Sequence, residues 1–496
     1  MPVYFKTLDI PEKDRVTILG DSIIDVNLML KGESIHSNSE GGIRVNGKAI
    51  NSPGFNIGGA GNVLDDAIHH GGPDIFYMTL LGDAEPSDLE DLSGLPFPKD
   101  DTLFQNPSEV VKYHLDTLKD KYETFSYLAL TDDLYVKGVA SWGIGNNGKF
   151  SYHESTHPSI KIRYKSRHAF EGQTGNLSTV FRLDIDSDPY VLREIPSRNG
   201  LVGDQHPPSN FTDIHHMDLE TRRQLFDNIT HSSVFAVSDY NKGSAKAFTH
   251  LVPAKSRTTT KERERAGKIP HPTIKESLYH ILAQSLEDED SNNDPYERYI
   301  ESLNFINNTL WTIADVKPRQ PGSALYMYTG FDVVKMNEQA FLDVYQHVYI
   351  KQSEYPSIIE MPVSVLGATM ARICETYSFR SLVVTRANKS MPAIVYVVNG
   401  GIHHVVTSDL HRAERRDSSK PLDVVGAGDA FMAGLIDTFS DKPKDESMVR
   451  HRNAIGTQEF QHLLIDAVQT AVERATRKVQ LADAFYTGKA RHWLGK

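Results

Sequence analysis

Short apolar runs that end in polar residues recur along the chain. The first covers residues 16–19 and ends at Gly20-Asp21. Similar runs cover residues 233–237, 312–314, 332–334 and 382–384. Such runs have the length of buried strands, and helix-length segments separate them, so the pattern predicts an α/β fold with a mostly parallel sheet. The polar residues at the strand ends then gather at one edge of the sheet, where sites of such folds lie.

Other segments show helical or hairpin patterns. Residues 62–72 place apolar side chains on one helical face and end in two glycines. Residues 274–282 continue a capping-box pattern, Thr273 to Glu276, as an amphipathic helix, and residues 299–310 predict a second one. The pair of apolar runs around Asn399-Gly400 indicates a β-hairpin whose turn uses positive φ angles.

We expect one domain over residues 1–496 with several additions. At about 26–57 and 134–186 the sequence is rich in Gly, Asn and Ser and shows short alternating patterns that predict strands. Both features are typical of a lid over a site. The charge-rich stretch at about 246–308 is interpreted as an insertion. Residues at about 441–496 are interpreted as a C-terminal helical extension.

Composition and charge narrow the class of protein. The formal net charge of −12 argues against nucleic acid as the main partner. The chain shows neither a run of roughly 20 apolar residues nor a signal-peptide pattern, so we expect no membrane partner and a cytoplasmic location. A single cysteine, Cys374, excludes an internal disulfide, and the scattered histidines lack metal-ligand spacing.

The most informative motif is Gly426-Ala427-Gly428-Asp429, which a helix-like segment, 430–436, follows at once. Three small residues let successive backbone N–H groups point at one spot, and the helix adds the positive end of its dipole. This pattern predicts an anion hole with a carboxylate base at its rim. Taken alone, it also fits a glycine-rich turn that merely starts a helix.

Six further motifs, in chain order, resemble those of ribokinase-like carbohydrate kinases. Within that family they are most similar to the kinase domain of bacterial D-glycero-beta-D-manno-heptose 7-phosphate kinase. The motifs are Gly20-Asp21-Ser22-Ile23-Ile24-Asp25, Gly58-Gly59-Ala60-Gly61-Asn62-Val63, Lys161-Ile162-Arg163, Phe181-Arg182-Leu183-Asp184, Ser238-Asp239-Tyr240-Asn241-Lys242-Gly243 and the stretch 328–337.

The resemblance implies a ribokinase-like three-layer sandwich with helices on both faces of the sheet and a small β lid. It implies that Asp429 is the catalytic base and that the amides of Gly426, Ala427 and Gly428 stabilise the transferring phosphoryl group. The expected cofactors are ATP and Mg²⁺, with a monovalent cation near Asp423 as an option. The expected partners are a sugar or sugar phosphate and, through the lid, a second copy of the chain.

The resemblance also assigns binding residues. Substrate-binding residues would be Asp21, Asp25, Gly58, Gly59, Asn62, Lys161, Arg163 and Lys242, the last three as ligands of a phosphate already on the sugar. Nucleotide-binding residues would be Lys317, Asn337, Thr385 and Asp423, with Asn337 and Glu338 near the metal. Asp25 and Asn62 have simpler interpretations as a strand-end cap and a helix N-cap.

Ala387 and Ser390 stand where related nucleotide loops often carry glycine, and two further positions depart from the family pattern. Ala340 stands where the family has a glutamate after Asn337, and Val424 replaces a threonine before the glycine-rich turn. Both put nucleotide binding in question. Two alternatives to a heptose phosphate kinase therefore stay open: a kinase for another sugar or a nucleoside, and a kinase-derived binding or scaffold protein.

Overall fold

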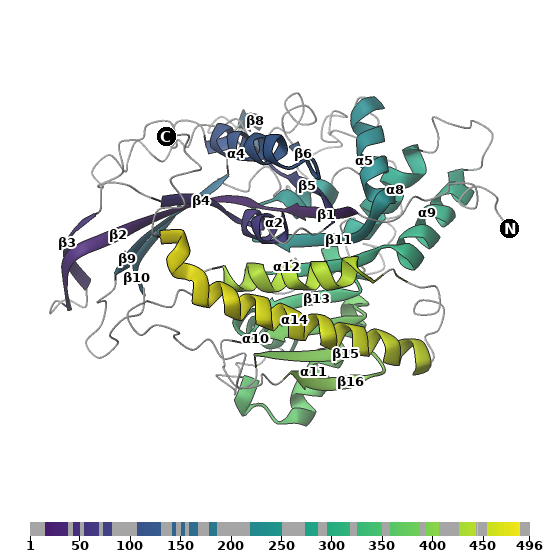
Figure 1. The fold of residues 1–496 in the computed structure, drawn as a ribbon. Coiled ribbons are helices and arrows are strands. Elements are labelled where there is room, and N and C mark those ends of the chain that lie inside the picture. The colour runs from purple at the N-terminus through teal and green to yellow at the C-terminus, as the bar shows by residue number, and fades with distance from the viewer. Residues whose placement is uncertain are drawn as a thin grey trace.

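The computed structural model describes residues 15–37, 43–49, 54–68, 73–81, 107–129, 141–144, 150–153, 158–166, 178–185, 219–249, 273–285, 295–317, 325–349, 358–386, 392–405, 426–442, 444 and 454–486. Its centre is a nine-stranded sheet in the order β16-β15-β14-β13-β12-β11-β1-β5-β6 (Figure 1). The strands are β1 (Arg15–Gly20), β5 (Asp74–Thr79), β6 (Phe125–Ala129), β11 (Ser232–Asp239), β12 (Trp311–Val316), β13 (Val333–Asn337), β14 (Ser381–Thr385), β15 (Ala393–Val397) and β16 (Gly401–Val405).

All neighbouring strands from β6 to β14 run parallel, and only β15 and β16 are antiparallel. The apolar runs that the sequence predicted as strands lie in β1, β11, β12, β13 and β14. Each of these strands is almost wholly buried, which explains its continuous apolar sequence. The predicted mostly parallel α/β sheet is confirmed.

Helices cover both faces of this sheet. The helices are α2 (Ala60–Ile68), α4 (Pro107–Lys121), α5 (Leu219–His231), α6 (Ser244–Thr249), α8 (Ile274–Ser285), α9 (Pro295–Thr309), α10 (Glu338–Tyr349), α11 (Val363–Tyr377), α12 (Ala427–Ser440) and α14 (Ala454–Tyr486), with short 3₁₀ turns η5 (Leu325–Tyr328) and η6 (Ile358–Glu360).

Alternate residues of one strand reach two different cores. In β11, Val234 and Ala236 pack with α2, α4, α12 and α14, whereas Phe235 and Val237 pack with α5, α6, α8, α9, α10 and α11. Successive side chains of a strand point to opposite faces, so the two cores lie on opposite sides of the sheet. The predicted three layers, helices on either side of a sheet, are therefore present.

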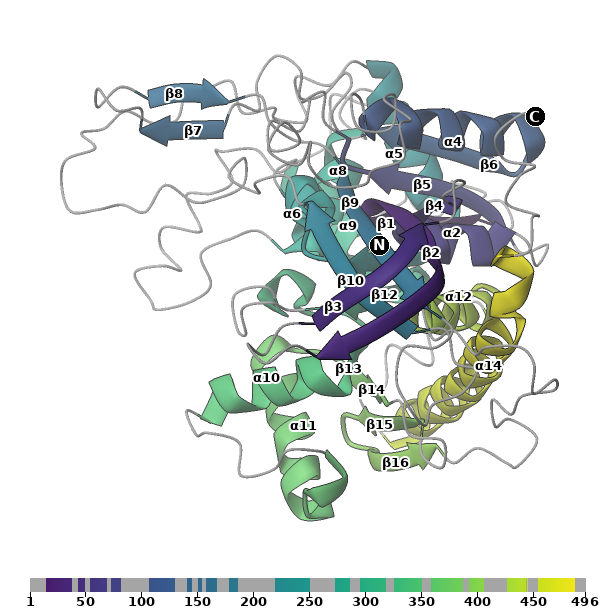
Figure 2. The ribbon, with the colours of Figure 1, turned by 90° about the vertical axis from the view of Figure 1, so that its left-hand side faces the viewer.

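A smaller sheet projects from one side of the molecule (Figure 1) and faces the viewer in Figure 2. Its order is β10-β9-β2-β3, with β4 paired to β2. The strands are β2 (Ser22–Ser37), β3 (Ile43–Ala49), β4 (Gly54–Gly59), β9 (Ser159–Ser166) and β10 (Ser178–Ile185), and a separate hairpin joins β7 (Ser141–Ile144) and β8 (Phe150–His153). Strands from both predicted lid segments thus meet in one sheet.

Local sequence signals differ in how well they located element ends. The Thr273 and Glu276 side chains each accept a hydrogen bond from the other's backbone N–H, at 3.1 and 2.7 Å, as the capping box predicted. The hairpin β15–β16 is also confirmed, with positive φ at Asn399 and Gly401. Helix α2, however, starts at Ala60, two residues before the predicted Asn62, because the chain already turns at Gly59.

The longest helix of the described part, α14, lies along α12 (Figure 1). Neither it nor any other helix among the described residues combines the length and apolar composition needed to cross a bilayer.

Candidate active site

Polar side chains gather where the parallel strands of the main sheet end. Because the strands run in the same direction, their carboxyl ends share one edge, and β1, β11, β12 and β13 lie next to one another there. In register, Asp315 of β12 lies beside Lys335 of β13, and Asn337 lies beside Thr385 of β14. The predicted nucleotide residues Lys317, Asn337 and Thr385 therefore share this edge with Asp21.

Asp429 lies in the first turn of α12, close to that edge. Its side chain is 5% exposed. The side-chain amide of Asn62 donates a hydrogen bond to its Oδ2 at 2.9 Å, and the Tyr240 hydroxyl donates to its Oδ1. The Lys317 ammonium is 3.6 Å from the same Oδ1. Residues far apart in the sequence thus fix both oxygens of this carboxylate.

These contacts decide the charge of Asp429. Burial acts to raise the pKa of its carboxyl, but the Lys317 ammonium and the hydrogen bonds from Tyr240 and Asn62 outweigh burial and hold that pKa below its ordinary value. Burial and the adjacent Asp429 in turn raise the pKa of the Tyr240 phenol well above its usual value. The phenol therefore stays protonated and donates a hydrogen bond to Asp429. Asp429 is therefore an ionised carboxylate with a fixed orientation.

The N-terminus of α12 carries no side-chain cap. Its N-cap residue is Gly426, whose φ of +81° suits glycine. The first N–H groups of a helix lack intrahelical partners, and the helix dipole adds positive potential there. The buried Lys335 ammonium lies 3.5 Å from the Gly428 carbonyl and 2.8 Å from Asp315. This end of α12 is suited to hold an anionic group beside Asp429.

The smaller sheet brings a second set of polar residues to the same place. Asp25 of β2 is 3% exposed, and its Oδ1 is 2.8 Å from the Arg163 guanidinium of β9. A Cβ atom on Gly58 would lie 2.2 Å from Asp25 Oδ2, so only glycine lets the backbone approach this carboxylate. Asp25 pairs in register with Asn56 of β4, whose side-chain amide donates a hydrogen bond to Asn62 Oδ1 at 3.0 Å, and Asn62 donates to Asp429, so a chain of contacts connects the two carboxylates.

Lys161 links the smaller sheet to Asp429 through Tyr240. Its ammonium lies 4.8 Å from the centroid of the Tyr240 ring, and the Lys317 ammonium lies 3.2 Å from the same centroid. Burial lowers the pKa of Lys161 to about 8, and the positive charges of Arg182, Lys242 and Arg163 act in the same direction. Basic side chains from two strands and one loop therefore converge beside Asp25.

Asp21 has a different environment from the one its predicted role implies. Its carboxylate accepts hydrogen bonds from the backbone N–H groups of Tyr240, Lys242 and Ser244, at 2.8, 3.0 and 2.9 Å. The residue is 1% exposed. Asp21 thus holds in place the loop that carries Tyr240 and Lys242. Its carboxylate contacts backbone N–H groups, whereas the sequence predicted a contact with substrate.

Asn337 and Glu338 were predicted near a metal. The Asn337 side chain caps α10 by accepting from the Ala340 N–H at 2.7 Å, and Glu338 accepts from the Ile358 N–H at 2.9 Å and lies 3.5 Å from Arg386. No group of three or more His, Cys, Asp or Glu in the described part of the chain is arranged for a metal. The place of Asn337 and Glu338 near a metal stays a prediction. Asp423 and Val424 lie outside the described residues.

Three residues of this site were not given roles from the sequence: Tyr240, Asp315 and Lys335. Tyr240 lies inside one of the motifs and Asp315 follows an apolar run, so their positions in the sequence could have identified both as site residues. Lys335 sits inside a buried strand, where a lysine at 2% exposure is rare unless paired. Its partner could not be identified before the register of β12 and β13 was known.

Comparisons with known proteins give matches among solved structures alone, since no protein-family model and no curated protein matches the sequence. The chain is similar to ribokinase from Giardia lamblia, with 10% identity, TM-score 0.45, and coverage of 94% of this chain and 93% of that chain. It is similar to ribokinase from Thermotoga maritima, with 13% identity, TM-score 0.41, and coverage of 97% and 99%. Phosphofructokinase-2 from Escherichia coli, in complex with fructose-6-phosphate, matches with 11% identity, TM-score 0.38, and coverage of 94% and 98%.

Proposed function

We propose that this protein is an ATP-dependent sugar kinase that transfers the γ-phosphoryl group to a hydroxyl of a sugar or sugar phosphate. The observation that supports it best is the placement of Asp429. An ionised, oriented carboxylate lies at the uncapped N-terminus of α12, between basic residues at the end of the main sheet and the Asp25 region of the smaller sheet. Phosphoryl transfer needs such a base beside an anion-binding pocket and little other covalent chemistry.

The residues divide the reaction between them. Asp25 and Asn62, a carboxylate and an amide, are suited to sugar hydroxyls and orient the acceptor. Asp429 takes the proton of the acceptor hydroxyl while that oxygen bonds to the γ-phosphorus, and the bond to ADP breaks with its electron pair leaving on ADP. The amides of Gly426, Ala427 and Gly428, with Lys317, stabilise charge on the phosphoryl group.

Mg²⁺, when bound with ATP, would neutralise the charge of the phosphates, and Asn337 and Glu338 are the side chains expected near it. Because Asn337 and Glu338 are engaged with backbone N–H groups, no step above is assigned to a metal ligand of this chain. A requirement for Mg²⁺ and for a monovalent cation belongs to the proposal.

The acceptor that fits the basic side chains best is a phosphorylated sugar, as in heptose 7-phosphate kinases. Lys161, Arg163 and Lys242 would bind its phosphate, since their charges converge beside Asp25. We expect Lys242→Ala to raise the KM for a phosphorylated acceptor and to leave that for an unphosphorylated sugar unchanged. Steady-state kinetics with both acceptors measure this. Equal KM values for the phosphosugar in wild type and variant would show that Lys242 does not bind the phosphate of the acceptor.

Tyr240 provides a test through pH. The Tyr240 hydroxyl stabilises the charged form of Asp429, so Tyr240→Phe should raise the pKa of that carboxyl. A base is inactive when protonated, so activity falls as pH drops through its pKa, and the acid limb of kcat/KM should move to higher pH in the variant. The profile of Tyr326→Phe, which alters a partly buried tyrosine of η5, should match that of wild type. A limb that stays in place in Tyr240→Phe would show that this hydrogen bond does not tune the base.

A different function remains a second candidate. Ala340 packs in the core at 6% exposure where the family pattern has a glutamate, which favours a kinase-derived binding or scaffold protein. An intact, ionised Asp429 favours an enzyme, because a scaffold has no need of an oriented base. Calorimetry with MgATP distinguishes the two: the kinase proposal predicts binding, with or without a sugar, and a scaffold predicts none.

The acceptor itself can be found by a coupled ADP-release assay across a panel of sugars, sugar phosphates and nucleosides. The proposal predicts turnover with at least one sugar or sugar phosphate and a marked preference within the panel. No ADP release above background ATP hydrolysis with any member of the panel would contradict it.

A further inference from the structure

Two buried carboxylates bind the loop that follows β11 and carries Tyr240. The Asp21 carboxylate accepts from the backbone N–H groups of residues 240, 242 and 244. Asp239, the last residue of β11, accepts from the N–H of Asn241 at 2.6 Å through its Oδ1. Together the two carboxylates fix the backbone from which the Tyr240 side chain reaches Asp429.

The backbone of this loop depends on such support. Asn241 has a φ of +59°, in the left-handed region that residues other than glycine rarely adopt, and Gly243 has a φ of +117°. Conformations of this kind persist only where the surrounding structure holds them. The bond from the Asn241 N–H to Asp239 therefore helps to hold the left-handed residue that lies next to Tyr240.

Tyr328 supplies the second contact of Asp239. The tyrosine is fully buried in η5, and its hydroxyl donates a hydrogen bond to Asp239 Oδ2. Its ring packs edge-on against Phe331, with 5.5 Å between the ring centroids. Tyr328 belongs to the core that α5, α8 and α11 cover, whereas α12, which carries Asp429, covers the other face of the sheet. Tyr328 thus reaches the loop from the layer opposite to the proposed base.

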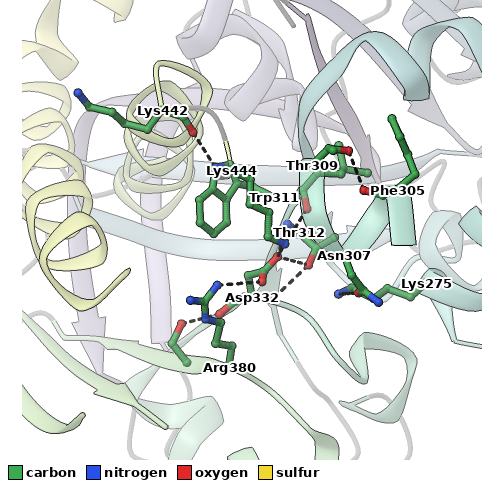
Figure 3. Close-up of polar contacts among 12 residues, drawn as sticks. Lys275, Phe305, Asn307, Thr309, Trp311, Thr312, Asp332, Arg380, Lys442 and Lys444 are labelled. Carbon is green, nitrogen blue, oxygen red and sulfur yellow. Dashed lines mark hydrogen bonds and ion pairs between the residues drawn. The ribbon is translucent and has the colours of Figure 1, made fainter. Parts of the chain in front are cut away.

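The turn after η5 is anchored to its neighbours. Asp332 donates its backbone N–H to the Thr312 hydroxyl and accepts at Oδ2 from the Thr312 N–H, both at 3.0 Å. The Lys444 ammonium donates to the same Oδ2 at 2.7 Å, and Figure 3 shows these contacts. The N–H of Gly330 donates to the Tyr377 carbonyl at 3.2 Å. These bonds tie the turn to β12 and α11, so η5 is a fixed support for its tyrosine.

The Tyr328 hydroxyl also affects the charge of Asp239. Burial and the charge of Asp21 raise the pKa of the Asp239 carboxyl, and the hydrogen bonds from Tyr328 and from the loop oppose that rise. Burial and the charge of Asp239 raise the pKa of the Tyr328 phenol well above its usual value, so the phenol remains a donor. Without this donor Asp239 would bind a proton more readily, and a neutral carboxyl accepts the Asn241 N–H more weakly than a carboxylate does.

We propose that Tyr328 is a positioning residue for phosphoryl transfer. It acts through Asp239 on the loop after β11, and that loop aims the Tyr240 hydroxyl at Asp429. The inference rests on the proposed function, because it takes Asp429 as the base. Tyr328 begins the stretch 328–337 that resembles a family motif, and its contact with Asp239 accounts for a tyrosine at this position.

A double-mutant cycle in kcat tests this pathway. Tyr328→Phe keeps the buried ring and removes only the hydroxyl. We expect it to lower kcat roughly 3- to 10-fold, because the loss of a charge-assisted hydrogen bond is only partly transmitted to the base. The KM for MgATP should not change, since the N-terminus of α12 keeps its contacts. Once Tyr240→Phe has removed the hydroxyl that the loop aims, adding Tyr328→Phe should change kcat less than about twofold, because the two residues act in one pathway.

Tyr377→Phe is the matched control for the cycle. Tyr377 is a buried tyrosine of the same core and stacks on Phe379, and its hydroxyl has no hydrogen-bond partner within the described ranges. Its substitution should leave kcat within about twofold of the parent in both backgrounds. Fold-changes of Tyr328→Phe and Tyr240→Phe that multiply in the double variant would overturn the proposal, and so would a Tyr328→Phe enzyme that turns over as Tyr377→Phe does.

Hydrogen exchange without substrate separates this inference from the proposed function. Tyr328→Phe should speed exchange at the amides of residues 240–242 relative to wild type, whereas Tyr377→Phe should not. Equal exchange in wild type and Tyr328→Phe would show that Tyr328 does not hold the loop, even in an active kinase. A wild type that turns over no sugar would instead contradict the proposed function itself.

Discussion

Replacing Asp429 with asparagine should lower kcat by roughly 10²- to 10⁴-fold, the usual contribution of a general base. The amide preserves the shape of the side chain and its contact with Asn62, but it does not accept the proton of the acceptor hydroxyl. Sugar binding should persist, because Asp25 and the basic side chains beside it are unchanged. Steady-state kinetics with the best acceptor, together with calorimetry for sugar affinity, measure the two effects separately.

Asp441→Asn is the matched control for this variant. Asp441 is exposed at the other end of the same helix, which it caps through its backbone N–H, so replacing its side chain should leave kcat within about twofold of wild type. An Asp429→Asn enzyme with turnover close to wild type would exclude Asp429 as the base.

Replacing Lys335 with methionine should destabilise the protein by about 3–5 kcal/mol, the range for breaking a buried ion pair from one side. Lys335 and Asp315 are 2% and 1% exposed on their side chains and 2.8 Å apart. The variant leaves Asp315 buried with only the more distant Lys317 ammonium, at 3.6 Å. Urea unfolding of the wild type and the variant gives the change in the free energy of unfolding.

A double replacement distinguishes the Lys335–Asp315 ion pair from side-chain packing as the source of this stability. Asp315→Leu together with Lys335→Met removes both charges, and it should recover a large part of the stability that Lys335→Met loses. A double variant as unstable as the sum of the two single variants would show that the two side chains contribute independently. Both measurements concern stability alone and hold whichever function the protein has.

Sequence patterns predicted the elements of this fold better than the contacts between them. The apolar strand runs and the Thr273–Glu276 capping box depend only on residues close together in the chain, so they can be predicted from a single sequence. The predicted start of α2 was wrong because the turn at Gly59 depends on its close approach to the carbonyl of Asp21, which lies far from it in the sequence, between β1 and β2.

The candidate site shows the same division. The glycine-rich motif indicated Asp429, and the resemblance to carbohydrate kinases implied Asp25 and Asn62 as its neighbours. In the structure the Asn62 amide donates a hydrogen bond to Asp429. The role of Asp21 as an acceptor of backbone N–H groups required the position of the loop after β11. The stacking of Lys161 and Lys317 on Tyr240 required the placement of the smaller sheet against the main one.

The most direct test of the central claim is a crystal structure with MgADP, a fluoroaluminate and the acceptor that the ADP-release assay selects. The account predicts the acceptor hydroxyl within hydrogen-bond reach of the Asp429 carboxylate, and the fluoroaluminate against the amides of Gly426, Ala427 and Gly428. A nucleotide bound away from the N-terminus of α12, or an acceptor that does not approach Asp429, would contradict it.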